Sequence, residues 1–276
     1  MTGANLRISS SAMEVGPLHA VWPEWLISKT RSWVGAKMTG GRVEDIRLDV
    51  EGDFSGEKPR ITSIAGTVTM QAAQLRLSDS LPLFESLDGR LTIADNRGEI
   101  ILTDGRVGGL ALSTGKIEIL PIIGGKPAMG QVDLDLAGDS GAAMAVAADF
   151  GMGGAGGTAL TRIRSSGPSN LTFRAGFPIR RKLSPGSVEF EVEGSVARGS
   201  FANLPLDADA RDAEIRFMAD RQGFLVKGDA VIFGLAANVA YEAHGGRARL
   251  DLSTTGSDLS RVGQIASSLG YSGSGG

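Results

Sequence analysis

Few residues in this chain have the type and spacing that cofactor chemistry needs. The segment 151–156 has the glycine spacing of a dinucleotide-binding turn and follows an apolar run that ends at Phe150. Such a turn also needs a helix that begins at the glycines and an acidic residue about 20 positions later. The segment 158–166 is poorly helical, and the next acid along the chain is Glu189. We therefore interpret the glycines as a plain loop.

The histidines also argue against catalysis. The chain has two of them, His19 and His244, and it has no cysteine. A Ser-His-Asp site needs a histidine near a nucleophile, but neither histidine lies in a recognisable motif and no G-x-S-x-G sequence exists. Two distant histidines without cysteine also argue against a zinc or iron site. We predict no metal site.

Closely spaced acids are the remaining candidates for chemistry. Asp133 lies two residues before Asp135, and Glu189, Glu191 and Glu193 follow the same spacing. Paired carboxylates can act in acid–base catalysis or bind calcium. In a strand, however, a spacing of two places each set on one face, between apolar residues that point the other way. We interpret both sets as a solvated sheet face, and we predict no catalytic residue, no enzyme and no cofactor.

Composition narrows the class of protein. The chain has 276 residues, of which 40 are glycine and 42% are hydrophobic, and its formal net charge is −3. This is neither collagen-like nor disordered, and the balanced charge gives no basic surface for nucleic acid. We find no secretory signal at the N-terminus and no run of roughly 18 apolar residues. Because residues 6–8 already alternate and residues 272–276 resemble a linker, we expect a segment of a larger protein.

The secondary-structure elements that carry these residues are predicted to be mostly strands. From Leu87 to Leu136 apolar and polar residues alternate, and we expect turns at 96–98, at 104–105 and at 124–127. Alternation bounded by such turns is typical of antiparallel strands with one apolar and one wet face. Similar runs cover 43–77, with a bulge near Ala72. The fold class is therefore mainly β: a long, strongly twisted antiparallel sheet that forms an open groove.

One amphipathic helix is predicted near the N-terminus, over 23–38, after one or two short strands within 5–21. Pro23 suits a first helical turn, Glu24 suits the positive end of the helix dipole, and the glycines at 40 and 41 would end it. All three tryptophans of the chain lie in or beside this segment. We interpret it as a helix packed across one end of the sheet; the alternative is a helix that contacts a membrane surface.

The expected organisation has two similar β-sections on either side of a glycine-rich seam. The seam includes an alanine-rich stretch, 142–148, which could form a short helix, and a second short helix is expected over 257–269. We expect a first β-groove section over 1–140 and the seam over 141–160. A second β-groove section follows over 161–256, and a terminal helix with a linker-like tail covers 257–276.

The apolar positions of the first section are mostly Leu, Ile and Val. Such a face suits the aliphatic core of a sandwich or a smooth groove for acyl chains, and composition does not separate the two. A groove has an energetic rationale, because each buried methylene contributes about 0.8 kcal/mol. The residues expected to line it are Ile46, Leu48, Val50, Val68, Met70, Leu91, Ile93, Leu110, Leu112, Ile117, Ile119, Val132, Leu134 and Leu136.

A family resemblance rests on six short segments. They are Trp22-Pro23-Glu24-Trp25-Leu26, Arg31-Ser32-Trp33-Val34, Gly40-Gly41-Arg42-Val43-Glu44-Asp45, Leu81-Pro82-Leu83, Leu87-Asp88-Gly89-Arg90-Leu91 and Val107-Gly108-Gly109-Leu110. In this order they resemble the start of the central domain of the AsmA-like proteins, nearest to the YhdP branch. There a tryptophan-bearing helix precedes a Gly-Gly turn and the first strand of a long sheet. The resemblance covers roughly residues 20–140 and continues more loosely to about 255.

The resemblance implies a periplasmic β-groove in a Gram-negative envelope that passes phospholipids from the inner toward the outer membrane. It also implies an inner-membrane anchor outside this chain. TamB and the eukaryotic bridge-like lipid transfer proteins are similar in architecture. This chain departs from the family in having no anchor and too little length to cross a periplasm, so we expect one section of a conduit. The family offers no catalytic residues to carry over.

The expected partners are therefore phospholipid and, through parts outside this chain, a membrane, without nucleic acid. The alternative is a closed β-sandwich that serves as a structural or assembly module and binds protein partners in the envelope. An enzyme that acts on an envelope polymer is a third reading, which the lack of a catalytic constellation weakens.

Overall fold

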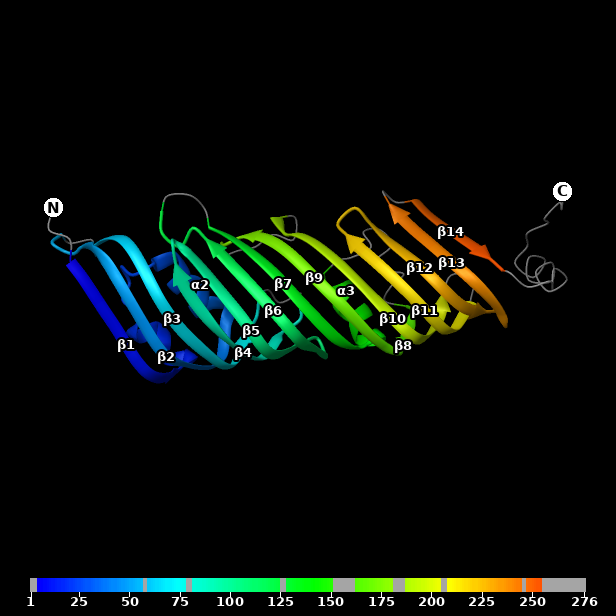
Figure 1. Cartoon of the computed structure of the whole chain (residues 1–276), viewed down its shortest axis with the longest axis horizontal. Helices are drawn as coiled ribbons and strands as arrows, with labels where there is room; N and C mark the ends of the chain where they lie inside the picture. The colour runs from blue at the N-terminus through cyan, green and yellow to red at the C-terminus, as the bar shows by residue number, and fades with distance from the viewer. Residues whose placement is uncertain are drawn as a thin grey trace. The chain divides into compact units, whose positions relative to one another are not determined.

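The computed structural model describes residues 4–56, 59–77, 81–124, 128–150, 162–180, 187–204, 208–244 and 247–254. The chain is mainly β, with one long antiparallel sheet that contains 14 strands. The strands follow one another in chain order from β1 to β14, except that β8 lies off this path and pairs with β10 (Figure 1). The sheet is not closed into a barrel, and the described strands do not form the two facing sheets of a sandwich. The predicted fold class is thus confirmed.

The strands are β1 (Ala4–Glu14), β2 (Met38–Asp53), β3 (Arg60–Leu75), β4 (Phe84–Ala94), β5 (Arg97–Val107), β6 (Leu110–Leu120), β7 (Met129–Asp139), β8 (Arg164–Ser166), β9 (Pro168–Pro178), β10 (Glu189–Leu204), β11 (Ala208–Asp220), β12 (Gly223–Ile232), β13 (Leu235–His244) and β14 (Arg247–Ser253). The described helices are α1 (Val15–Val21), α2 (Ser28–Lys37) and α3 (Ser140–Asp149). None of these helices has the length and apolar character needed to span a bilayer.

Contacts divide the chain into two compact units. Unit 1 comprises Met1–Ala137 and Leu171–Glu191, and unit 2 comprises Gly138–Asn170 and Val192–Gly276. In unit 1, α1 and α2 lie on the apolar face of the first strands, where Val15 of α1 packs against Val43 and Ile46 of β2. Figure 1 shows these helices, in blue, behind the strands.

In unit 2, α3 is held beside β8. Asp139 caps its N-terminus, because the Gly141 backbone N–H donates to Asp139 Oδ1 at 2.8 Å. The hydroxyls of Ser140 and Ser165 contact each other, and the Ser140 N–H donates to the carbonyl of Gly167 at 2.8 Å. This helix was predicted over 142–148, and its existence is confirmed. The helix predicted over 257–269 lies outside the described residues.

The helix predicted over 23–38 is wrong in its first part. Residues 15–21, predicted as strand, form α1, and residues 22–27 form an irregular connection before α2 begins at Ser28. Pro23 therefore does not lie in a first helical turn. The connection turns so that Leu26, which is 3% exposed, packs on the sheet. Tertiary burial here overrides the local helix preference. Nor do the glycines at 40 and 41 end the helix, since β2 already begins at Met38.

Two predicted turns are also corrected. Between β4 and β5 the chain turns at Asp95 and Asn96, both at positive φ, which is the geometry of a two-residue hairpin. Gly105, predicted as a turn, lies within β5, and the chain turns instead at Gly108 and Gly109. Asp-Gly is a strong turn signal in sequence, but here it accommodates an irregularity of the ladder between β4 and β5.

Bulges keep the apolar residues on one face. The register of β2 with β3 shifts between Glu44 and Arg47, where Asp45 has φ +47°. One extra residue on β2 lets Val43 and Ile46 both face inward although they are three apart. The bulge predicted near Ala72 is confirmed, because the register of β3 with β4 shifts between Met70 and Ala73.

Candidate functional site

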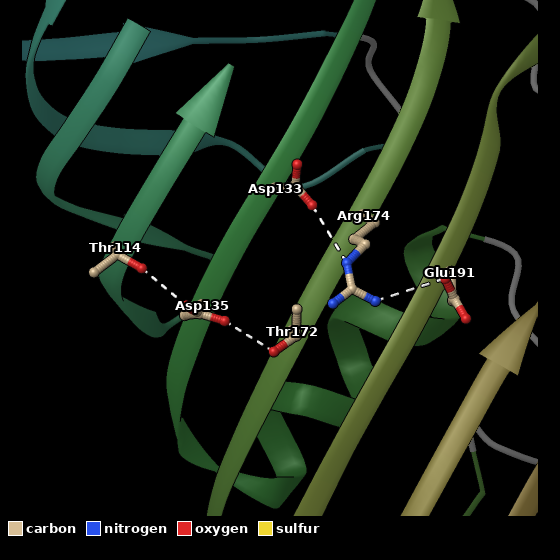
Figure 2. Close-up of polar contacts among 6 residues, drawn as sticks. All are labelled: Thr114, Asp133, Asp135, Thr172, Arg174 and Glu191. Atoms are coloured by element: carbon tan, nitrogen blue, oxygen red, sulfur yellow. Dashed lines mark hydrogen bonds and ion pairs between the residues drawn. The ribbon is translucent and has the colours of Figure 1, made fainter. Parts of the chain in front are cut away.

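Asp133, Asp135 and Glu191 lie on the outer, polar face of unit 1 (Figure 2). The hydroxyls of Thr114 and Thr172 each donate to the Asp135 carboxylate at 2.8 Å. Arg174 lies between two carboxylates, with Nε 3.4 Å from Asp133 and Nη1 3.7 Å from Glu191. These contacts join β6, β7, β9 and β10 by cross-strand pairs. The carboxylates therefore have structural partners on an open surface.

A second ladder on the outer face joins β5 and β6. Lys116 Nζ lies 2.9 Å from Glu99 and 3.0 Å from Glu118, and Arg97 lies 3.6 Å from Glu118. The hydrogen bond from Lys116, together with the charges of Lys116 and Arg97, lowers the pKa of Glu118. The pKa of Lys116 is raised by the hydrogen bonds to both glutamates. These shifts favour the charged forms, so neither group is set to exchange a proton near neutral pH.

Within the described ranges, no group of three or more His, Cys, Asp or Glu side chains is arranged to hold a metal ion. His244 lies exposed at the end of β13. The glycine-rich segment at 151–156 lies outside the described residues. The remaining candidate is the apolar face.

The strand register builds the apolar face of unit 1 from rows of directly opposed residues. One row crosses five strands from β3 to β7, with Val68 opposite Leu91, Leu91 opposite Ile100, Ile100 opposite Ile117, and Ile117 opposite Val132. Side chains directly opposite on antiparallel strands share a face and lie in contact. The result is a continuous aliphatic row about five strands wide, or roughly 20 Å, since neighbouring strands lie about 4.8 Å apart.

The fourteen residues predicted to line the face all lie on it, but they fall into two groups. Eight are buried and belong to the protein's own core: Ile46, Val50, Ile93, Leu110, Leu112, Val132, Leu134 and Leu136. Six are half-buried and keep accessible surface that a ligand could contact: Leu48, Val68, Met70, Leu91, Ile117 and Ile119. A ligand could reach the first group only if the protein moved.

Sequence reasoning missed several inward residues. Val43 and Val107 are 4% and 1% exposed and lie on the same face, each beyond a bulge or an irregular pair. Ile100, which is half-buried, and Leu102, which is 3% exposed, were missed although they follow the regular alternation of β5. The signal that could have found Val43 and Val107 is a polar residue or glycine that interrupts the alternation, such as Asp45 or Gly105. Counting strictly by twos across a bulge would place Val43 and Val107 on the opposite face.

Glycines alternate with large side chains across this face. Gly98 lies opposite Ile93 and Ile119, and Gly130 lies opposite Ile119. A Cβ at Gly130 would be 3.0 Å from the ring of Phe177, which therefore packs over the glycine. The large neighbouring side chains occupy the space above the glycines. The surface over Gly98 and Gly130 is therefore continuous and has no polar side chain.

The connection between α1 and α2 covers the part of the apolar face nearest the N-terminus. Leu26 packs with Val50, Ile64 and Ile93, which come from β2, β3 and β4. Trp25 contacts Phe54 edge-on, with ring centroids 5.6 Å apart. The first part of the face is therefore closed by the chain itself, and the half-buried Leu91 packs against the same cluster. Ile117 and Ile119 lie further along, outside this cluster, and are half-buried.

Unit 2 has an apolar face of a different composition. Its buried residues are largely alanines, at 208, 210, 213 and 230, with Ile232. Phe217, Phe224 and Tyr241 form an aromatic group, with successive centroids 6.2 and 6.5 Å apart. Leu250, opposite Tyr241 on β14, is 42% exposed.

The sheet defines a class, a single-layer antiparallel β-protein, and in unit 1 it has a solvated outer face and an aliphatic inner face. Comparisons with protein-family models, with curated proteins and with solved structures gave no match.

Proposed function

We propose that the apolar face of unit 1 binds the acyl chains of phospholipids, and that the chain is a section of a lipid-transfer protein of the bacterial envelope. The observation that carries the proposal is the row from Val68 through Leu91, Ile100 and Ile117 to Val132. Four of these residues are half-buried aliphatics, and the row crosses the strands without a polar side chain. An acyl chain that lies along the row makes apolar contacts on every strand.

The free energy of such binding is large enough to matter. At about 0.8 kcal/mol per buried methylene, moving a 16-carbon chain from membrane into water costs on the order of 12 kcal/mol. A continuous aliphatic surface would remove much of that cost at each point of the path. The same surface has no requirement for a particular headgroup, which suits transfer of bulk phospholipid.

The resemblance to the AsmA-like proteins of the YhdP branch supports the same function and extends it. It implies a location in the periplasm, anchorage to the inner membrane through other parts of the protein, and movement of phospholipid between the inner and outer membranes. A single open sheet whose strands, apart from β8, follow one another in chain order is the architecture that such a path requires, because successive strands then extend one surface.

The first experiment asks whether lipid is bound. Native mass spectrometry of the chain after mild extraction should show co-purified phospholipid. The alternative, a module that binds protein partners in the envelope, predicts no phospholipid, and a lipid-free chain that also takes up none from vesicles would contradict the proposal.

The second experiment uses two neighbouring isoleucines that point to opposite faces. Ile100 lies half-buried in the inner row, and Ile101 is 43% exposed on the outer face. We expect Ile100→Asp to abolish uptake of fluorescent phosphatidylethanolamine from vesicles, because a carboxylate in the row must be desolvated by the acyl chain. Ile101→Asp should leave uptake unchanged. Leu112 and Leu134 are poorer targets, since at 6% and 2% exposure a charge there would also unfold the unit.

A further inference from the structure

The connection Trp22–Ile27, called the strap below, occupies a surface that the proposed function assigns to lipid. Leu26 of the strap is 3% exposed and lies against Val50 and Ile64, which are 0% and 3% exposed. These two residues belong to the same inner face as the accessible row. The strap therefore covers the inner face at Val50 and Ile64, beside the row at which the acyl chain lies in the proposed complex.

The strap is held together by hydrogen bonds within itself and to α2. Trp22 Nε1 donates to the Leu26 carbonyl at 2.7 Å, and the Leu26 N–H donates to the Pro23 carbonyl at 3.1 Å. Arg31 Nε donates to the Trp22 carbonyl at 2.9 Å. The core contacts of the strap with the sheet are apolar side-chain contacts. Apolar contacts are non-directional, so an acyl chain can replace them, whereas a strand could not leave without losing its ladder.

The two ends of the strap are fixed more firmly than its middle. On one side α1 follows directly from β1. On the other, Lys37 Nζ donates to the Leu77 carbonyl at 2.6 Å, and the Arg76 N–H donates to the Lys37 carbonyl at 2.8 Å. Ile27, the last residue of the strap and the N-cap of α2, has φ +46°, a left-handed conformation that is strained for a β-branched residue.

We propose that the strap is a displaceable plug, which covers the apolar face over β2 and β3 until an acyl chain takes its place. This inference rests on the proposed lipid function and adds a regulated end to the binding surface. Lipid reaches Val50 and Ile64 only when Leu26 has left them, whereas Ile117 and Ile119 are accessible in both states.

The test locks the strap in place. Because the chain has no cysteine, the only disulfide that the double variant Leu26→Cys with Ile64→Cys can form joins the strap to β3, and it is closed under oxidising conditions and open under reducing ones. Both forms are illuminated with vesicles that contain phosphatidylethanolamine with a diazirine on its acyl chain, and adducts are mapped by mass spectrometry. We expect the locked form to lose adducts on Val50 and to keep those on Ile117 and Ile119.

A second variant loosens the strap and does not depend on disulfide geometry. Trp25→Ala removes the contact with Phe54 and should increase adducts on Val50 and Ile64 relative to the unchanged protein. Val21→Ala is the matched control, because Val21 is 59% exposed and should not affect labelling.

Equal labelling of Val50 in locked and open forms, or no increase with Trp25→Ala, would overturn the plug while leaving the lipid function intact. Absence of adducts on Ile117 and Ile119 in every form would overturn the lipid function, and the plug with it.

Discussion

Strands β2 and β3 of unit 1 pair through a β-bulge, and strands β11 and β12 of unit 2 pair through a bulge of the same kind. The side chains that pack beside the two bulges differ. In β2, Asp45 at φ +47° makes the bulge, and in β11 Asp212 at φ +49° does the same. The inward residues around the first bulge are Val43 and Ile46. Around the second, the equivalent inward residues are both alanines, at 210 and 213.

The partner strands match in the same way. Gly66 on β3 and Gly228 on β12 each lie opposite the residue that is three positions after the bulge on the partner strand. Their φ angles are +151° and +156°. A Cβ at either glycine would lie 2.0 Å from a carbonyl oxygen, of Arg47 in unit 1 and of Glu214 in unit 2. The comparison teaches that the bulge geometry is fixed by backbone contacts, while the volume of the inner face is set by the side chains beside it.

The largest expected effect comes from removing the large side chain of Ile46 beside the bulge of unit 1. Ile46→Ala should lower the free energy of unfolding of this unit by about 2–5 kcal/mol, because Ile46 is 7% exposed and packed under α1. All three tryptophans lie in unit 1, so urea denaturation followed by tryptophan fluorescence reports this unit. Ile46→Val should cost less, about 0.5–1.5 kcal/mol. A loss no greater for Ala than for Val would show that the site is not tightly packed.

The shared bulge geometry is tested by two matched substitutions. Gly66→Ala and Gly228→Ala should each destabilise their own unit by about 2–4 kcal/mol, because both add a Cβ against a carbonyl at positive φ. Only Gly66→Ala should shift the tryptophan transition; Gly228→Ala should shift the part of the circular dichroism signal that tryptophan does not follow. Gly56→Ala, with no atom within 4 Å of the added Cβ, is the control and should be nearly neutral.

A smaller effect is expected from filling the alanine site of unit 2. Ala213→Ile makes this site resemble that of unit 1, but Ala213 is 1% exposed and already in contact. We expect overpacking to cost about 1–3 kcal/mol. Ala236→Ile, on an exposed position of β13, should change stability by less than about 0.5 kcal/mol. If denaturation showed that Ala213→Ile stabilises unit 2, the site around Ala213 would have room for the larger side chain. The two sites would then differ less in volume than their side chains do.

The smallest effect concerns the outer face of unit 1. Lys116→Met should raise the pKa of Glu118 toward the ordinary value of about 4.3, because the hydrogen bond and charge that lower it are lost. A carboxyl NMR titration measures this directly. In the unchanged protein the lowered pKa of Glu118 contributes stability above its unfolded pKa, and that contribution is lost as pH falls through the folded pKa. Because the charge of Arg97 remains beside Glu118, the variant should show a weaker acidic pH dependence, and an unchanged titration would contradict the ladder.

Alternation in sequence predicted the sheet and the side of it on which fourteen residues lie, because period-2 side-chain placement is a local property of strands. It failed at Val43 and Val107, where a bulge or irregular pair changes the side that the next residue faces. It also failed over 15–27, where packing of Leu26 on three strands distant in sequence decides the backbone. Neither event leaves a periodic signal.

By itself, the sequence determined an antiparallel β-protein with an aliphatic face and an acidic and basic one, since both follow from residue types two positions apart. Only the tertiary structure decided which of the aliphatic residues are sealed in the core and which remain accessible. Burial depends on what packs above each residue. At β2 and β3 the strap, which precedes α2 in the chain, packs above the inner face, and the register of the sheet, not the local sequence, brings its partners together.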